Sequence, residues 1–436
     1  MATSSRKLLS ARHLAIRVLR DLHRRQGFSN RILSEHLENN THLSQRDRAL
    51  TTTLVYGVLR HQIRLDHIID QHAKAAHKLK GELRVIIRLG AFELLELKHP
   101  LRVVGSEMNK LAKRLDPRGQ LRGMLTAILI QIEQHPETAD TPMLDQLEKR
   151  WSLPRWLAGR WIKALGPQTA LARAQAIASP PPIDLRIDLT KQHAETVLAQ
   201  LQEQHPGIQI ERDPDQPQCL RTRRGGDLFY GPLYEQGVIS IQSLGSQQAA
   251  IELMPRAGER ILDACAGMGT KTLHIAELMG YQGSILAVDS HEERMDSLQE
   301  LFSEREHAPL VLQTLTHDLC VRAPELDDCP FDAILLDAPC TGLGNLARHP
   351  ELRTRARYED IALCARLQEQ LLDACVPRLA PGGRLLYAVC SLEAEEGPLQ
   401  VKRALEKHDL LCEHEAIWSP EADGCDGFYL ARLRVK

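Results

Sequence analysis

The chain has 436 residues, of which 43% are hydrophobic and 26% charged, as in ordinary soluble globular proteins. It is too long for one typical domain, so we expect two or three. No apolar run approaches the roughly 18 residues that a membrane-spanning helix needs, so we expect no membrane association. Residues 1–170 hold 29 Lys and Arg against 16 Asp and Glu, and the remainder holds 26 against 41. This asymmetry suggests that the first part binds a polyanion, although a solvated basic surface would give the same pattern.

All ten cysteines lie at or after Cys219 and none forms a CxxC pair, so we expect no structural zinc or other metal site. No secretory signal precedes the first predicted helix, which indicates a cytoplasmic protein whose thiols stay reduced. Such thiols are either packed in a core or reactive, and only their surroundings separate the two roles.

Residues 1 to about 135 are predicted to form a bundle of helices, because apolar residues recur at intervals of three and four. The segments are Leu14–Leu22, Ile32–Leu37, Leu50–Leu59, Leu65–Ile69, Leu83–Leu97 and Leu121–Ile132. A polar stretch with two prolines, Gln134–Pro142, indicates a linker. A further helical stretch, Leu144–Leu165, is followed by consecutive prolines at 180–182, which stop a helix.

After the prolines the pattern changes to that of a small α/β module reaching to about residue 235. Its predicted elements are a strand, a helix and a second strand, at Ile183–Leu189, Ala194–Gln204 and Ile208–Glu211. We therefore expect three parts: a helical domain over residues 1–140, a helical linker with the small module over 141–237, and a larger α/β domain over 238–436.

The larger domain alternates strands and helices. The predicted strands are Arg260–Ala264, Ser284–Asp289, Leu310–Leu315, Phe331–Asp337 and Arg384–Cys390. The predicted helices are Lys271–Met279, Glu292–Ser303, Leu363–Leu379 and Pro398–Lys407. Elements of these lengths indicate a doubly wound, mainly parallel sheet that is covered on both faces. Ligands bind such sheets at the carboxyl ends of the strands, so the residues that close each strand are the candidates for function.

The first strand of this sheet runs into a loop of small residues, 265–272, which lets the backbone turn sharply and approach a ligand. Asp289 closes the second strand about 20 residues beyond the loop, a spacing that suits an acid holding a ribose. Asp318, after the third strand, could accept a hydrogen bond from an adenine amino group. The loop lacks the full GxGxxG and the Walker pattern, which disfavours an NAD enzyme and a P-loop NTPase.

Two neighbouring strand ends each present a cysteine. The fourth strand ends in Asp337-Ala338-Pro339-Cys340, and the fifth ends in Val389-Cys390, with several glutamates close behind. Both thiols should therefore lie at the ligand-binding edge of the sheet, although two structural cysteines could also occupy such positions.

These residues resemble the motifs of the Sun (Nol/Nop/Sun) family of RNA cytosine-C5 methyltransferases. The matching motifs are DACAGMGTKT (263–272), AVD (287–289), FDAILLDAPCTGLG (331–344), RHPE (348–351) and LLYAVCSLEAEEG (385–397). The segments RDRAL (46–50) and YGVLR (56–60) resemble the NusB-like helical domain that bacterial members acting on 16S rRNA carry. The resemblance covers essentially the whole chain. It implies a multidomain fold: an all-α NusB-like bundle, a small α/β module and a Rossmann-like class I methyltransferase domain.

The resemblance also implies the roles of individual residues. Cys390 matches the nucleophile that attacks the base, Cys340 the cysteine that releases the product, and Asp337 the acid beside cofactor and base. The cofactor, S-adenosylmethionine, would be held by the loop Cys265, Ala266, Gly267, Met268, Gly269, Thr270 and Lys271, with Asp289 at the ribose, Asp318 at the adenine and Asp337 beside it. The implied partner is a single-stranded or loop region of 16S rRNA, bound by a monomer.

The cofactor loop departs from the usual family pattern, because Met268 replaces a proline and Thr270 a glycine. An impaired methyltransferase fold that only binds rRNA is therefore the alternative function. In the basic N-terminal part, the candidate phosphate contacts are Lys110, Lys113, Arg114, Arg118 and Arg122, for which a solvated surface is the competing interpretation.

Overall fold

The computed structural model describes residues 9–73, 76–135, 141–223, 228, 231–303, 309–322 and 330–436. The chain forms two compact units. The first contains residues 1–179 together with 346–355, and the second contains 180–345 and 356–436.

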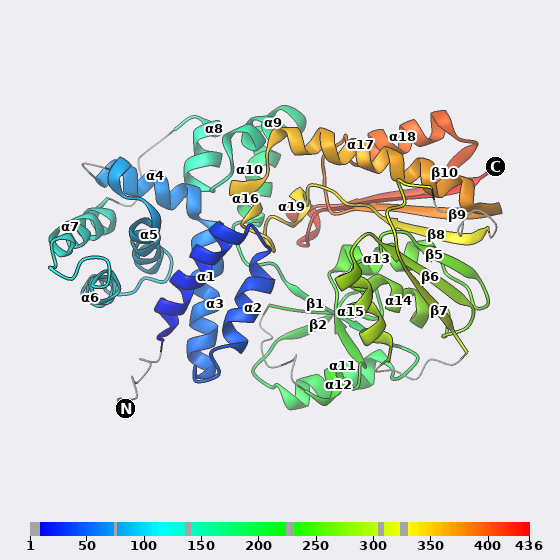
Figure 1. Cartoon of the computed structure of the whole chain (residues 1–436), viewed down its shortest axis with the longest axis horizontal. Helices are drawn as coiled ribbons and strands as arrows, with labels where there is room; N and C mark the ends of the chain where they lie inside the picture. The colour runs from blue at the N-terminus through cyan, green and yellow to red at the C-terminus, as the bar shows by residue number, and fades with distance from the viewer. Residues whose placement is uncertain are drawn as a thin grey trace. The chain divides into compact units, whose positions relative to one another are not determined.

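The first unit begins with the predicted bundle of helices, coloured blue to cyan in Figure 1. Its helices are α1 (Ala11–Arg25), α2 (Ser29–Glu38), α3 (Gln45–Arg60), α4 (Gln62–His72), α5 (Gly81–Leu95), α6 (Leu101–Ala112) and α7 (Leu121–Gln134). Their apolar stripes meet in one buried core. Helices α3 and α5 approach closely at Gly57, where a Cβ atom would lie 2.0 Å from Cζ of Phe92. The predicted linker at 134–142 lies partly outside the described residues.

The same unit continues through α8 (Met143–Asp145), α9 (Arg155–Leu165) and α10 (Pro167–Ala176). It also includes residues 346–355, which carry the short helix α16 (Leu352–Arg355). We had assigned this segment to the larger α/β domain and residues 141–179 to the middle part. The difference arises from contacts between residues far apart in the sequence, which local patterns do not report.

The second unit begins with a small sheet of four strands in the order β2-β3-β1-β4, all antiparallel. These strands are β2 (Ile210–Arg212), β3 (Cys219–Thr222), β1 (Ile183–Ile187) and β4 (Ile239–Ile241), with α11 (Ala194–Gln204) and α12 (Pro232–Glu235) between them in sequence. Strand β4 extends this module past residue 237, where we had placed its end.

The larger sheet has seven strands in the order β10-β11-β9-β8-β5-β6-β7. They are β5 (Arg260–Asp263), β6 (Ser284–Asp289), β7 (Val311–Thr316), β8 (Phe331–Asp337), β9 (Leu379–Val389), β10 (Leu410–Trp418) and β11 (Phe428–Val435). Strands β5 to β9 are parallel, and β11 pairs antiparallel with both β9 and β10. This confirms the expected Rossmann-like sheet. Leu379, predicted to end a helix, instead starts β9.

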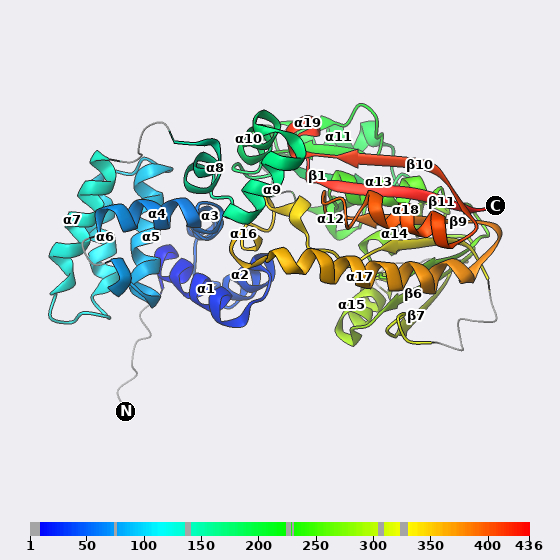
Figure 2. The same cartoon turned by 90° about the horizontal axis from the view of Figure 1, so that it is seen from above.

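Helices cover both faces of this sheet (Figure 2). On one face α17 (Tyr358–Cys375) and α18 (Pro398–Lys407) bury apolar side chains against the strands. On the other, α13 (Leu244–Leu253), α14 (Thr270–Leu278) and α15 (Glu292–Ser303) do the same. Consecutive residues of a strand pack into the cores on opposite faces of the sheet, because side chains alternate along a strand. Ile261 and Leu262 of β5 are an example.

Candidate active site

The carboxyl ends of β5, β6, β8 and β9 form the edge of the sheet that carries the predicted site. The strand order reverses at β5, since β6 lies on one side of it and β8 on the other. Such a reversal opens a crevice at the carboxyl ends, where open α/β sheets bind ligands. The predicted residues after β5, β6, β8 and β9 therefore share this edge.

The loop between β5 and α14 is held open by two glycines with positive φ, 56° at Gly267 and 83° at Gly269. The backbone N–H of Gly267 donates to Oδ2 of Asp289 at 3.1 Å, which ties the loop to the end of β6. Asp289 is buried and also accepts from the N–H of His291 at 3.0 Å. Met268, which replaces the usual proline, is 64% exposed. The loop and Asp289 thus meet as the sequence predicted.

Asp263 closes β5 beneath this loop, and the sequence pattern predicts no role for it. Its carboxylate is buried and accepts from the Thr272 hydroxyl at 2.7 Å. Burial raises the pKa of Asp263 to about 7. Its Oδ1 atom has no hydrogen-bond partner among the described residues. A buried, unpartnered polar atom beneath a glycine loop is suited to a polar ligand group.

Lys271 and Asp337 form an ion pair, with Nζ and Oδ2 2.6 Å apart. Burial opposes the charge on Lys271, but the attraction of Asp337 and of Cys390 raises its pKa overall. We had assigned Lys271 to the cofactor loop alone. The structure directs its ammonium group to the end of β8, near Cys390.

The sulfur atoms of Cys340 and Cys390 lie 3.2 Å apart at the ends of β8 and β9. The hydrogen bond with Cys390, together with burial, raises the pKa of Cys340 well above the usual value for a thiol. Cys340 therefore keeps its proton and can donate a hydrogen bond to the Cys390 sulfur.

Glu396 joins the two cysteine-bearing loops, a role that we did not predict. It is fully buried, and its carboxylate accepts from the N–H and hydroxyl of Thr341 at 2.8 and 2.6 Å and from the Ser391 hydroxyl at 2.5 Å. Thr341 directly follows Cys340, and Ser391 directly follows Cys390. The available signal was the group of glutamates after Cys390, but sequence alone does not show which of them points inward.

Asp318 lies at the end of β7 and is exposed. Its carboxylate accepts from the backbone N–H of Cys320 at 2.9 Å, so it caps its own turn.

Within the described ranges, no group of three or more His, Cys, Asp or Glu residues is arranged to hold a metal ion. No helix in those ranges is long and apolar enough to cross a membrane.

A mixed sheet of this order, with its ligand-binding edge at the reversal between β6 and β8, is the architecture of the Rossmann-like methyltransferases. Comparison with known protein families agrees with this assignment of the fold. A family model described as 16S rRNA methyltransferase RsmB/F matches residues 250–434. A NusB family model matches residues 9–134, and a ferredoxin-like domain of RsmF/B-like methyltransferases matches 153–228.

The chain is 33% identical over 405 residues to ribosomal RNA small subunit methyltransferase B of Erwinia tasmaniensis, covering 90% of this chain and 91% of the relative. It is 32% identical over 405 residues to the protein of the same name from Escherichia coli O157:H7, covering 90% and 92%. The chain therefore belongs to the RsmB family of 16S rRNA methyltransferases.

Solved structures share the fold. The crystal structure of PH0851 superposes with a TM-score of 0.82 at 24% identity, covering 99% of this chain and all of the other. A methyltransferase homologue from Pyrococcus horikoshii gives a TM-score of 0.60 at 26% identity, covering 68% of this chain and 100% of that one. The first comparison thus extends over the helical parts as well as the methyltransferase sheet.

Proposed function

We propose that this protein transfers a methyl group from S-adenosylmethionine to C5 of a cytosine in small-subunit rRNA, with Cys390 as the nucleophile. The observation that carries the proposal is the 3.2 Å separation of the Cys340 and Cys390 sulfurs beside the Lys271–Asp337 ion pair. A methyltransferase that alkylates oxygen or nitrogen needs no thiol pair. Methylation of C5 of cytosine needs a nucleophile such as a thiolate that adds to C6, because C5 is too weak a nucleophile to react unaided, and we assign the second thiol to release of the product.

The residues around the loop fit the cofactor. A Cβ atom at Gly267 would meet nothing within 4 Å, so the turn leaves space for a ligand. The unpartnered Oδ1 of Asp263 offers a polar partner beneath it. We assign the loop from Cys265 to Lys271 to the methionine part and Asp289 to the ribose, with Asp318 at the adenine end. When bound, the cofactor supplies an electrophilic methyl group on a sulfonium.

The chemistry of the base follows from the thiol pair. The Cys390 thiolate forms a bond to C6, which places electron density on C5 and allows C5 to take the methyl group. Two groups can donate a hydrogen bond to the ring as this charge develops: the ammonium of Lys271, and the Asp337 carboxyl when it carries a proton. Loss of the C5 proton to a base and departure of the Cys390 sulfur then restore the aromatic ring. We assign this release step to Cys340.

The substrate that we propose is an unpaired cytosine, because a base must leave its stack to meet Cys390. The proposal is tested by bisulfite sequencing of rRNA from cells that lack the protein. One cytosine should lose protection, the purified protein should restore it, and Cys390→Ala should not restore it although it still binds S-adenosylmethionine. Restoration by Cys390→Ala would overturn the assignment.

A scaffold that binds rRNA without methylating it is the alternative, which the match to methyltransferase families does not favour. Calorimetric titration with S-adenosylmethionine separates the two functions. Saturable binding by the wild-type protein supports the enzyme, and absence of binding supports the scaffold.

A further inference from the structure

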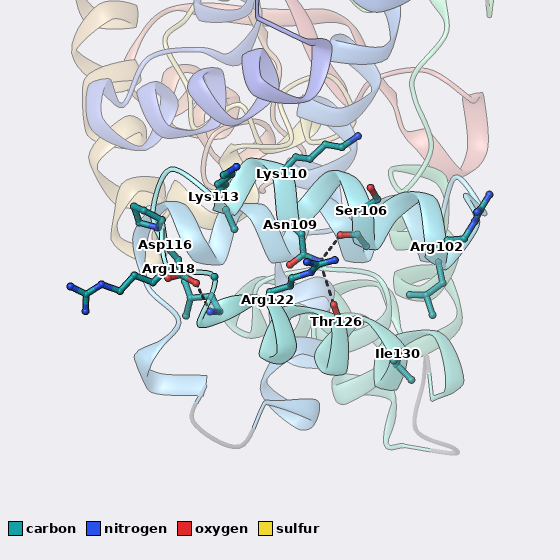
Figure 3. Close-up of a pocket in the computed structure, with 16 residues that line it drawn as sticks. Arg102, Ser106, Asn109, Lys110, Lys113, Asp116, Arg118, Arg122, Thr126 and Ile130 are labelled. Atoms are coloured by element: carbon teal, nitrogen blue, oxygen red, sulfur yellow. Dashed lines mark hydrogen bonds between the residues drawn. The ribbon is translucent and has the colours of Figure 1, made fainter.

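A groove runs between α6 and α7 in the first unit, with a volume of about 810 Å³ (Figure 3). Both helices and the turn that joins them line it. It belongs to the helical unit alone and contains none of the residues assigned above to the methyltransferase site. We call it the α6–α7 groove.

The groove is strongly basic. Five cationic side chains line it, with Asp116 as the single acid: Arg102, Lys110, Lys113, Arg118 and Arg122. The Asp116 carboxylate is occupied, because it accepts a hydrogen bond from the backbone N–H of Leu121. Lys110 pairs with Glu107 on the exposed surface of its own helix. The remaining four cations have no carboxylate within 4 Å among the described residues, so their charge is available to a ligand.

Figure 3 shows cationic residues on both sides of the groove: Lys113 follows the end of α6, and Arg118 and Arg122 lie in the turn and at the start of α7, with the Arg122 side chain between the two helices. The N-terminal end of a helix carries partial positive charge. The first turn of α7 contains no acidic residue, and Arg122 adds a further positive charge there. The Asp116 carboxylate at the Leu121 N–H offsets part of this charge, and Arg118 and Arg122 leave this end of the groove with a net positive charge that suits an anion.

The floor of the groove is kept open by Gly105. This residue is buried, yet a Cβ atom built on it would meet nothing within 4 Å. Alanine is favoured over glycine within a helix by about 1 kcal/mol, so glycine here weakens α6 and widens the groove. The lining contains no aromatic side chain, which removes base stacking as a means of binding.

We infer that the α6–α7 groove binds the phosphate backbone of a structured segment of rRNA, separately from the segment that carries the target cytosine. Cations on two walls, without aromatic partners, fit a sugar–phosphate chain that is read by charge and shape. The inference rests on the proposed function only in taking rRNA as the substrate. Arg114, a candidate from the sequence, does not line the groove and pairs with Glu82.

The test is the salt dependence of binding of the full-length protein to a labelled small-subunit rRNA fragment. The variant Lys113→Gln/Arg118→Gln/Arg122→Gln should reduce the slope of log affinity against log salt concentration by about 2 to 3, since each phosphate contact contributes about 0.7 to 0.9. The KM for rRNA should rise while kcat stays unchanged. A matched control, Arg46→Gln/Lys80→Gln/Lys163→Gln, removes equal charge from exposed residues outside the groove and should keep the wild-type slope.

A second pair of variants tests the groove without removing any cation. Gly105→Glu places a carboxylate in it and should weaken rRNA binding, whereas Gly123→Glu adds the same charge to the exposed side of α7 and should have less effect. Wild-type slopes in the triple variant and equal effects of the two glutamates would overturn the inference and favour an acidic protein partner. Binding is measured without methyl transfer, so the two proposals can fail separately. If the wild-type protein transfers no methyl group but the triple variant still lowers the salt slope, the proposed function is overturned and the inference about the groove stands.

Discussion

The mechanism that we propose gives Cys340 and Cys390 different roles although their sulfur atoms are adjacent. In that mechanism the raised pKa of Cys340 keeps its proton in place while Cys390 attacks the base. If Cys340 is needed for release, Cys340→Ala should still form the bond between Cys390 and the base but fail to break it. We expect a covalent protein–RNA adduct, visible as a slowly migrating band in denaturing gels. Cys412→Ala, on β10, is the control that should give no band, and a Cys340→Ala protein without the band would remove Cys340 from the release step.

Glu396 should act as a positioning residue, because it holds the residues that follow both cysteines. Glu396→Gln keeps the shape but presents amide hydrogens to donors that need an acceptor. Hydrogen bonds to a charged group contribute about 1.5 to 3 kcal/mol, so kcat should fall about 10- to 100-fold. The KM values and the affinity for S-adenosylmethionine should not change, and Glu406→Gln on the exposed face of α18 should leave all of them intact. A fall in cofactor affinity as large as the fall in kcat would mean that Glu396 only maintains the fold.

The raised pKa of Asp263 makes stability depend on pH. The folded protein holds this proton up to a pH of about 7, whereas the carboxyl of an unfolded chain loses it near 3.8. Stability is therefore lost as the pH rises between these values, by up to about 4 kcal/mol. Asp263→Asn should reduce this loss, as measured by urea unfolding of the second unit at pH 5 and pH 8. If the free energy of unfolding depends on pH in the same way for the wild-type protein and Asp263→Asn, Asp263 is already ionised in the folded protein.

At the scale of elements, residues 346–355 connect distant parts of the first unit. Arg353 is fully buried and donates to the backbone carbonyls of Arg60 at 3.2 Å, Trp151 at 3.0 Å and Ile177 at 2.5 Å. Burial lowers its pKa to about 9. Arg353→Met would leave three buried carbonyls without a donor, each costing about 1 to 3 kcal/mol. We expect the free energy of unfolding of this unit to fall by about 3 kcal/mol or more, while Arg366→Met on the exposed side of α17 changes it little.

The elements show what a sequence pattern can and cannot predict. Strands β6 and β8 and helices α15 and α18 begin and end where the apolar spacing placed them, because each buries a face of regular period. Adjacent strand ends also predicted the meeting of the two cysteines. Three features were not predictable, because each depends on side chains that only the folded chain brings together. They are the Lys271–Asp337 ion pair, the inward orientation of Glu396, and the contacts of the buried Arg353 side chain.

At the scale of the whole molecule, the two units have separate apolar cores, yet the chain leaves the second unit at residue 345 and returns at 356. Their unfolding can be told apart, because Trp151, Trp156 and Trp161 lie in the first unit and only Trp418 lies in the second. S-adenosylmethionine at 100 times its Kd should stabilise the unit that binds it by about 2.7 kcal/mol.

We therefore expect the cofactor to raise the second unit's transition in calorimetry while the fluorescence transition, dominated by the first unit's tryptophans, stays in place. Arg353→Met should do the reverse and lower the fluorescence transition alone. Asp289→Ala, which removes the carboxylate that we assign to the ribose, is the control that should abolish the cofactor shift. If the cofactor moves both transitions equally, the crossing segment 346–355 makes the two units unfold as one, and binding at the methyltransferase site then stabilises the helical unit through the chain itself.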